Sequence, residues 1–375
     1  MTNFPISRPL ITLEEIQKVS EVMKSKWISS QGKYIKLFEK RFSKFNQTKY
    51  SVSVSNGSVA LILALKALGV SKNDEVIIPN ITFSATINSI INIGAKPVIV
   101  DIRKDNWTID IKKLEKKITK KTKAIIVVHI YGQPVDINNL LKIKKKYNLK
   151  IIEDCAEAHG AEYNRKKVGS FFDIGCFSFY ANKIFTTGEG GICCTNKKSL
   201  YKKLLLLKCQ GLPSAIENKI DISKRFLCTE YGFNFRMTNI QAAIGYVQLL
   251  KARKILKERD YISKVYTNCL SKNKFIIFPK SLPNAKSVNW IFTIIIKKNI
   301  KKLMRYLKKN KIETRPIFYP FDKTKIFKKY VDNNESYANS SYFFKNGISL
   351  PTYNGIRSKD VAYICKKINQ FCYEK

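Results

Sequence analysis

Histidine is scarce in this sequence, whose 375 residues include only His129 and His159. Its nine cysteines form no Cys-x-x-Cys pair, so the ligand spacing of a zinc site is absent. We therefore predict no bound metal. The odd number of cysteines, most of them inside apolar runs such as GGICCTN, indicates reduced thiols and a cytoplasmic location.

Long apolar runs are also absent. No uninterrupted run approaches the ~18 residues that a helix needs to span a bilayer. The first residues, MTNFPISRPLITLEEIQKV, lack the basic segment and following apolar stretch of a signal peptide. We expect a soluble intracellular protein with no membrane partner.

Acidic residues are few: 28 Asp and Glu stand against 69 Lys and Arg, which gives a net charge of +41. Such an excess first suggests a polyanionic partner such as a nucleic acid. However, the lysines are scattered in short clusters on expected helix faces and loops, and Asn and Ile are abundant too. A compositional drift toward Lys, Asn and Ile explains most of the charge. Since no focused cationic stripe with interleaved aromatic residues is present, we expect no nucleic-acid partner.

What is present is a regular alternation of apolar runs and helical patterns. The runs SVSVS, EVIIP, KPVIVDI, KAIIVVHI and LKIIEDC predict buried strands of a mostly parallel sheet covered on both faces by helices, an α/β fold. The capping-box spacing of TLEE at 12–15 predicts a helix through about residue 26. A helical segment over about 238–270 is expected to lead into a smaller α+β region that ends in a helix from about 358. We predict a large domain over 1–250, with an N-terminal arm, and a small C-terminal α+β domain over 251–375.

The first turn between strand and helix lacks the Gly-x-Gly-x-x-Gly motif of dinucleotide-binding folds. It reads SNGSVAL instead, with Asn56, Gly57 and Ser58 immediately before a good helix. Bare N–H groups at a helix start, beside a glycine that permits close approach, form a phosphate site. The alternative is a plain Asn/Ser helix cap.

Asp154 and Lys183 each stand at the end of an apolar strand, 29 residues apart. Taken alone, the carboxylate is typical of a helix cap, and the lysine of a side chain that extends to water. Together with the phosphate-site candidate, however, they match what pyridoxal phosphate (PLP) requires: a lysine amine for the Schiff base, an acid to keep the pyridine nitrogen protonated, and donors for the phosphate. The large domain is therefore predicted to bind PLP.

Three long motifs resemble the DegT/DnrJ/EryC1/StrS sugar aminotransferases, PLP enzymes of fold type I. They are EDCAEAHGA, GCFSFYANKIFTTGEGG and EYGFNFRMTNIQAAIGYVQL. The resemblance runs nearly end to end, from SRPLITLEEIQKV to GISLPTYNGI. Within the family, WISSQGKY, SFYANK and IETRPIFYP look most like the GDP-perosamine synthase branch.

The resemblance implies a role for eight residues. Lys183 would be the Schiff-base lysine, and Asp154 the partner of the pyridine nitrogen. The other six would bind the cofactor: its phosphate, its ring hydroxyl or its ring face. They are Gly57, Ser58, Phe83, Glu157, Ser178 and Asn234, the last of which would reach the phosphate of a neighbouring subunit in a homodimer with shared active sites.

The resemblance also implies a reaction, in which L-glutamate gives its amino group, through PLP, to the 4-keto carbon of a nucleotide-linked 6-deoxyhexose. GDP-4-keto-6-deoxymannose is the expected acceptor, with a UDP- or dTDP-linked sugar, or amination at carbon 3, as alternatives. A sugar 3-dehydratase is disfavoured because those enzymes carry histidine in place of the Schiff-base lysine. Four residues are expected to contact the substrate: Arg236, Trp290, Arg315 and Tyr319. Asp322 stands where the perosamine branch often has histidine.

Overall fold

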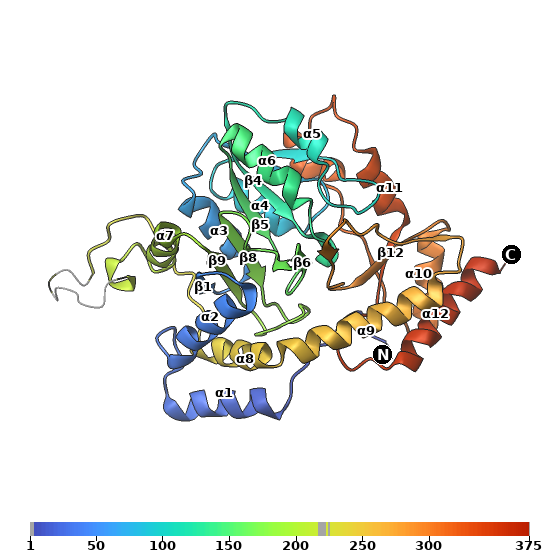
Figure 1. Cartoon of the computed structure of the whole chain (residues 1–375), viewed down its shortest axis with the longest axis horizontal. Coiled ribbons are helices and arrows are strands. Elements are labelled where there is room, and N and C mark those ends of the chain that lie inside the picture. Colours follow the sequence, from blue (N-terminus) through green and yellow to red (C-terminus); the bar gives the residue numbers. More distant parts are fainter. Residues whose placement is uncertain (1–3, 217–222, 224–225, 375) are drawn as a thin grey trace.

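The apolar runs form a seven-stranded sheet in the computed structural model, which describes residues 4–216, 223 and 226–374 (Figure 1). The strand order is β1-β9-β8-β5-β4-β2-β3. The strands are β1 (Tyr50–Val54), β2 (Glu75–Pro79), β3 (Lys96–Val100), β4 (Thr122–Val128), β5 (Lys150–Asp154), β8 (Ile174–Ser178) and β9 (Gly191–Thr195). The neighbours from β8 through β5, β4 and β2 to β3 pair in parallel, whereas β9 is antiparallel to both β8 and β1. The expected mostly parallel sheet is confirmed.

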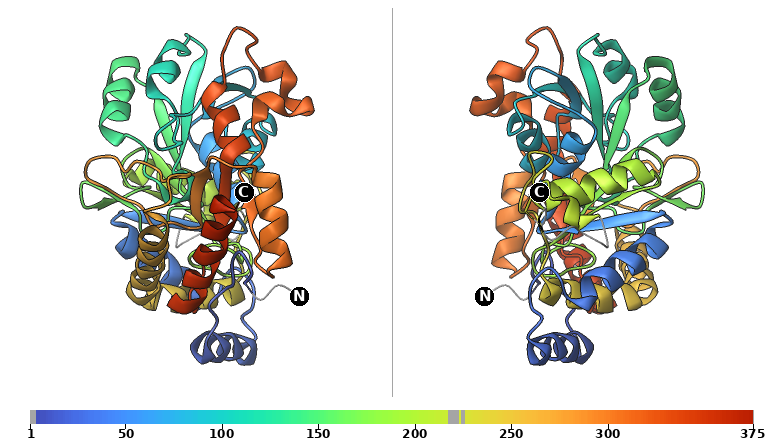
Figure 2. Two further views of the ribbon diagram at one scale, coloured as in Figure 1. Left: turned by 90° about the vertical axis from the view of Figure 1, so that its right-hand side faces the viewer. Right: turned by 90° about the vertical axis from the view of Figure 1, so that its left-hand side faces the viewer.

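Helices cover both faces of this sheet and bury most of its strand side chains (Figure 2). Alternate residues of β5 show the two layers: Ile152 packs in the cluster that holds α3 (Gly57–Ala67) and α7 (Lys198–Lys208), and Ile151 in the cluster that holds α6 (Ile137–Tyr147). The helices α2 (Lys33–Asn46) and α8 (Asn239–Leu250) pack over the β8 and β9 end of the sheet. Two shorter helices complete the layers, α4 (Ser84–Ile91) and α5 (Ile111–Lys116).

The C-terminal part has its own four-stranded sheet, in the order β10-β12-β14-β13. Its strands are β10 (Ile276–Ile277), β12 (Phe292–Ile296), β13 (Arg315–Pro316) and β14 (Gly347–Leu350), and its helices are α10 (Ile300–Lys309), α11 (Ala338–Asn346) and α12 (Ser358–Tyr373). A small sheet of β6 (Glu162–Tyr163), β7 (Lys166–Lys167) and β11 (Ala285–Lys286) joins a hairpin of the first part to the second. The smaller α+β region and its final helix are as the sequence predicts.

The expected helical segment over 238–270 is divided at Lys251 into α8 and α9 (Ala252–Leu270), and α9 runs out toward the C-terminal part (Figure 1). The predicted domain boundary at 250/251 falls at this joint and stays a prediction. The N-terminal helix α1 (Leu13–Ser25) begins as expected, since the Glu15 carboxylate accepts a 2.9 Å hydrogen bond from the Thr12 N–H. The residues before it lie against the C-terminal part: Thr352 N–H donates to the Ile6 carbonyl (2.9 Å).

All nine cysteines are unpaired, and six of them are buried; the expected reducing location stays a prediction. In the described part of the chain, every helix is too short or too polar to cross a bilayer.

Candidate active site

Asp154 is the last residue of β5 and lies buried at the carboxyl edge of the sheet. Its carboxylate accepts hydrogen bonds from the Thr86 hydroxyl (2.9 Å) and from the Ala156 N–H (3.2 Å). Burial raises the pKa of Asp154, and these two donors and the Lys183 amine oppose that rise. Among the described residues its carboxylate forms no ion pair within 4.0 Å.

Lys183 lies in the turn between β8 and β9, where its N–H donates to the Tyr180 carbonyl (2.9 Å). The residue is half-buried, but its amine lies among protein atoms, and Nζ is 3.8 Å from the centre of the Trp290 ring. Burial lowers the pKa of this amine, and the charges of Glu157 and Asp154 act against that lowering. The structure thus brings the predicted Schiff-base lysine, Lys183, close enough to Asp154 for the charge of each to shift the pKa of the other.

Glu157 is the third member of this group. It is buried, and its Oε2 accepts a 2.7 Å hydrogen bond from the Tyr131 N–H. Tyr131 presents this N–H from a left-handed backbone conformation, with φ of 49°. Burial raises the pKa of Glu157 to about 7, against the attraction of Lys183. Burial thus favours the protonated form of Glu157.

At the predicted phosphate site, the first residue of α3, Gly57, lies directly against the last residue of β8, Ser178. A Cβ added to Gly57 would lie 2.7 Å from the Cβ of Ser178, so only glycine lets the start of α3 approach the end of β8 this closely. The Asn56 side chain accepts from the Val59 N–H (3.0 Å). Gly57 and Ser58 are the first two residues of α3, so their N–H groups have no carbonyl of the same helix to bind. They are available to an anion at this helix start.

The remaining aromatic and substrate candidates differ in their exposure to solvent. Phe83 is 57% exposed, and its ring meets the Phe318 ring edge-on at 6.0 Å. Arg315 is exposed and acts electrostatically on the Lys183 amine, which places its charge near the site. Tyr319 is equally exposed. Trp290, in contrast, is buried, so it can offer a substrate only part of its ring.

Asn234 and Arg236 lie apart from this group. Both side chains are exposed, and Arg236 Nε donates to the Asn234 amide oxygen (2.9 Å). Arg236 lines a cavity of about 1270 Å³ beside α2 and α7. No hydrogen bond or ion pair within the described ranges joins either residue to Asp154 or Lys183, and the expected roles of both residues stay predictions.

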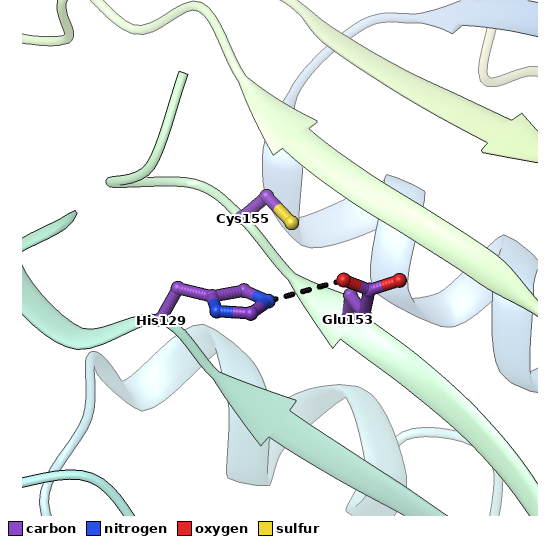
Figure 3. Close-up of side chains that lie close together, drawn as sticks. All are labelled: His129, Glu153 and Cys155. Atoms are coloured by element: carbon purple, nitrogen blue, oxygen red, sulfur yellow. Dashed lines mark hydrogen bonds and ion pairs between the residues drawn. The ribbon is translucent and has the colours of Figure 1, made fainter. Parts of the chain in front are cut away.

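A second buried cluster lies beside the site and consists of His129, Glu153 and Cys155 (Figure 3). His129 Nδ1 accepts from the Val135 N–H (3.2 Å), so the proton is on Nε2, which donates to Glu153 Oε2 (3.2 Å). The Glu153 carboxylate also accepts three backbone N–H groups, from Gly169 (2.5 Å), Phe171 (2.9 Å) and Phe172 (3.0 Å). These four hydrogen bonds occupy the lone pairs of the Glu153 carboxylate that a metal would need. The three backbone bonds also hold the 169–172 loop against the end of β5.

Two residues of the site escaped the sequence analysis. Thr86 lies three residues after Phe83 in ITFSAT, one helical turn into α4, and this spacing is the signal that places its hydroxyl near the same strand ends. Tyr131 follows the apolar run KAIIVVHI, where a residue just past a parallel strand is a candidate for a ligand site. Its role depends on a backbone conformation that the sequence does not mark.

Comparisons with known proteins agree with this geometry. The model of the DegT/DnrJ/EryC1/StrS aminotransferase family matches residues 9–369. The GDP-perosamine synthase of Escherichia coli O157:H7 is 39% identical, with 100% of both chains covered. The GDP-perosamine synthase of Vibrio cholerae is 37% identical, with 98% of each chain covered.

Solved structures give the same result. The aminotransferase from Psychrobacter cryohalolentis superposes with a TM-score of 0.92 at 27% identity, over 97% of this chain and 98% of that one. A GDP-4-keto-6-deoxymannose-3-dehydratase with bound GDP-perosamine superposes with a TM-score of 0.91 at 28% identity, over 98% of this chain and 100% of that one. The fold and the family expected from the motifs are confirmed. The chain belongs to the DegT/DnrJ/EryC1/StrS aminotransferase family.

Proposed function

We propose that this chain is a PLP-dependent nucleotide-sugar aminotransferase. It moves the amino group of L-glutamate to the 4-keto carbon of GDP-4-keto-6-deoxymannose and yields GDP-perosamine and 2-oxoglutarate. The observation that carries the proposal is the buried group of Asp154, Glu157 and Lys183, whose charges act on one another. The names of the relatives, GDP-perosamine synthases at 36–39% identity over nearly their full length, support the choice of substrate.

The described residues fit PLP. A buried carboxylate without a cation is costly, and a protonated pyridine nitrogen would supply the missing charge at Asp154. The phosphate would take the free N–H groups of Gly57 and Ser58 and the Ser178 hydroxyl. Phe83 offers its ring to the cofactor ring, and Glu157 offers its carboxyl to the ring hydroxyl.

When bound, PLP supplies an aldehyde that carries the amino group and a ring that withdraws electrons from the bonds at the reacting carbon. Asp154 keeps the proton on the ring nitrogen. Lys183 Nζ takes a proton from the α-carbon of the amino donor and later delivers one to the sugar carbon that receives the amine. Burial lowers the pKa of this amine and so favours the neutral form that the first of these steps requires. Arg315 holds an anionic group of the substrate, either the carboxylate of glutamate or a phosphate of the nucleotide.

The active unit in this proposal is a homodimer in the cytoplasm, in which Asn234 completes the phosphate site of the other subunit. The exposed position of Asn234 supports this arrangement. So does a set of apolar side chains on and beside α1 that the single chain leaves in solvent, with exposed fractions between 46% and 73%. They are Ile11, Leu13, Ile16, Met23, Trp27 and Ile28. A second copy of this chain would cover them.

One experiment separates this reaction from its alternatives. Purified protein with PLP should be yellow, bleach with L-glutamate and regain its colour with 2-oxoglutarate. The bleached form is then offered a panel of GDP-, UDP- and dTDP-linked 4-keto and 3-keto sugars, with mass spectrometry of the products. We expect amination of GDP-4-keto-6-deoxymannose at carbon 4. A product that has lost the 3-hydroxyl would identify a 3-dehydratase, and turnover by Lys183→Ala would contradict the assignment of the lysine.

A further inference from the structure

Three segments that are distant in the sequence meet at the peptide bond before Lys183. The Asn182 carbonyl accepts a 2.7 Å hydrogen bond from the Trp290 indole N–H and a 3.3 Å hydrogen bond from the Ser7 hydroxyl. A carbonyl oxygen has two lone pairs, so these two donors saturate it. The N-terminal arm and the loop before β12 thus hold the same backbone atom, one residue from the lysine.

Trp290 is itself held from two sides. The Arg259 guanidinium, which is 2% exposed, donates to the Trp290 carbonyl (2.8 Å). No ion pair joins this arginine to an acid in the described part of the chain. Its other hydrogen bonds go to Thr352 and Asn354. The indole ring also lies within 9° of parallel to the Tyr131 ring, at 6.3 Å between ring centres. The first contact holds the Trp290 backbone, and the second lies against one face of its ring.

The face of that indole meets the Lys183 amine, since Nζ lies 3.8 Å from the ring centre. An ammonium group over an indole face is attracted by the negative face of the ring, and indole is the strongest of the aromatic side chains in this respect. The ring therefore favours the charged form of Lys183, whereas burial favours the neutral form.

We propose that Trp290 is a positioning residue for Lys183. Its N–H, with the Ser7 hydroxyl, fixes the backbone at Asn182. Its ring face is the place where the Lys183 amine rests whenever that amine is not bonded to the cofactor. The inference rests on the proposed function, because it assigns Lys183 as the residue that bonds PLP.

Covalent capture of PLP by protein freed of cofactor tests this inference. The neutral Lys183 amine attacks the aldehyde carbon, a C=N bond forms and one water molecule leaves, so the rate at which the C=N absorbance appears reports the fraction of neutral amine. The capture rate of the wild type should rise with pH as Lys183 loses its proton, and the midpoint of this rise includes the effects of Asp154, Glu157 and Arg315, which none of the variants changes. Trp290→Leu removes the ring face, and we expect this midpoint to fall by about one pH unit. Trp290→Phe keeps a weaker face and should shift it less, in the same direction.

Two variants serve as controls. Ser7→Ala removes one donor to Asn182 but leaves the ring face, so its midpoint should equal that of the wild type. Trp107→Phe changes another buried tryptophan, whose ring stacks on Phe343 instead, and should also leave the midpoint unchanged. Circular dichroism checks the folding of each variant, and if Trp290→Leu does not fold, Trp290→Phe decides.

A wild-type midpoint in the folded Trp290 variants would overturn the inference and leave the proposed function intact. A shift of the same size in Trp107→Phe would overturn it too, because the effect would then be general. A wild-type protein that captures no PLP at any pH would overturn the proposed function, and this inference with it.

Discussion

The Thr86 hydroxyl donates a 2.9 Å hydrogen bond to the carboxylate of Asp154, at a buried site where no ion pair within the described residues balances that charge. A short polar side chain on α4 thereby orients the acid at the end of β5. Because these two residues set the position and the charge of the acid at this strand end, they are the first residues to test.

Asp154→Asn should lower kcat/KM for amine transfer by at least roughly 10²-fold, because losing one member of a buried charge pair costs about 3–5 kcal/mol. The amide cannot hold a proton on the ring nitrogen of PLP. The two half-reactions, with glutamate and with the keto sugar, should both slow, as followed by stopped-flow absorbance. Thr86→Val is the matched control, since it keeps the acid and the side-chain shape. We expect it to lose about tenfold, the value of one hydrogen bond to a charged group. If the asparagine variant were no slower than the valine variant, Asp154 would not be the partner of the ring nitrogen.

The raised pKa of Glu157 predicts that the free energy of unfolding depends on pH. Burial raises its pKa to about 7, from an ordinary value of 4.5. Between these pH values the folded chain keeps a proton that the unfolded chain has lost, so this group makes the free energy of unfolding fall as pH rises; above about pH 7 its cost is constant. Glu157→Gln removes the ionisable group and can still accept from the Tyr131 N–H. In cofactor-free protein, the stability of this variant relative to wild type should therefore increase from about pH 5 to about pH 8. Urea unfolding at both pH values measures the difference, and a difference that does not change with pH would contradict the buried, proton-holding state.

The close contact between Gly57 and Ser178 can be tested by a double-mutant cycle. Gly57→Ala places a Cβ 2.7 Å from the Ser178 Cβ, and overpacking of this kind costs about 1–3 kcal/mol. PLP affinity, measured by absorbance titration, should fall by roughly 10–100-fold. In a Ser178→Gly background the same alanine should cost much less, because the atom that it strikes is gone. Equal losses in both backgrounds would show that the alanine acts through something other than this contact.

The parallel sheet could be predicted because the apolar runs and helical patterns alternate without exception from SVSVS to LKIIEDC. The proximity of Asp154 and Lys183 could be predicted for a related reason: the end of β5 and the turn that follows β8 share one edge of the sheet, and the chemistry of the two side chains is complementary. The break at Lys251 could not be predicted, since no proline or glycine marks it in QLLKARKIL. The sequence could not reveal the roles of Tyr131 and Trp290 either. They depend on a left-handed backbone residue and on a loop that reaches the site from the C-terminal part, and neither leaves a local signal.

The hydrogen bonds of Glu153 predict that the cluster of His129, Glu153 and Cys155 stabilises the folded chain. Its carboxylate accepts from the His129 ring and from three N–H groups of the 169–172 loop. Glu153→Gln replaces one acceptor oxygen with a donor that faces those N–H groups, and should lower the free energy of unfolding by about 3–5 kcal/mol. Chelators and added zinc should leave the unfolding temperature of the wild type unchanged. A chelator that lowered it would show that the cluster binds a metal after all.

Asp322 exchanges two hydrogen bonds with Asn80 at the end of β2. Its Oδ1 accepts from the Asn80 amide (2.7 Å), and its N–H donates to the Asn80 amide oxygen (2.9 Å). This pair fixes the turn that follows Tyr319, one of the expected substrate contacts. Asp322→Ala should therefore raise KM for the nucleotide sugar by about tenfold, as the loss of a hydrogen bond to a charged group predicts. The glutamate half-reaction should keep its rate, because Lys183 and Asp154 are untouched. Asp322→Asn retains an acceptor oxygen and should lie close to wild type. An equal loss in both half-reactions of Asp322→Ala would place the effect on the shared cofactor site and not on the sugar pocket.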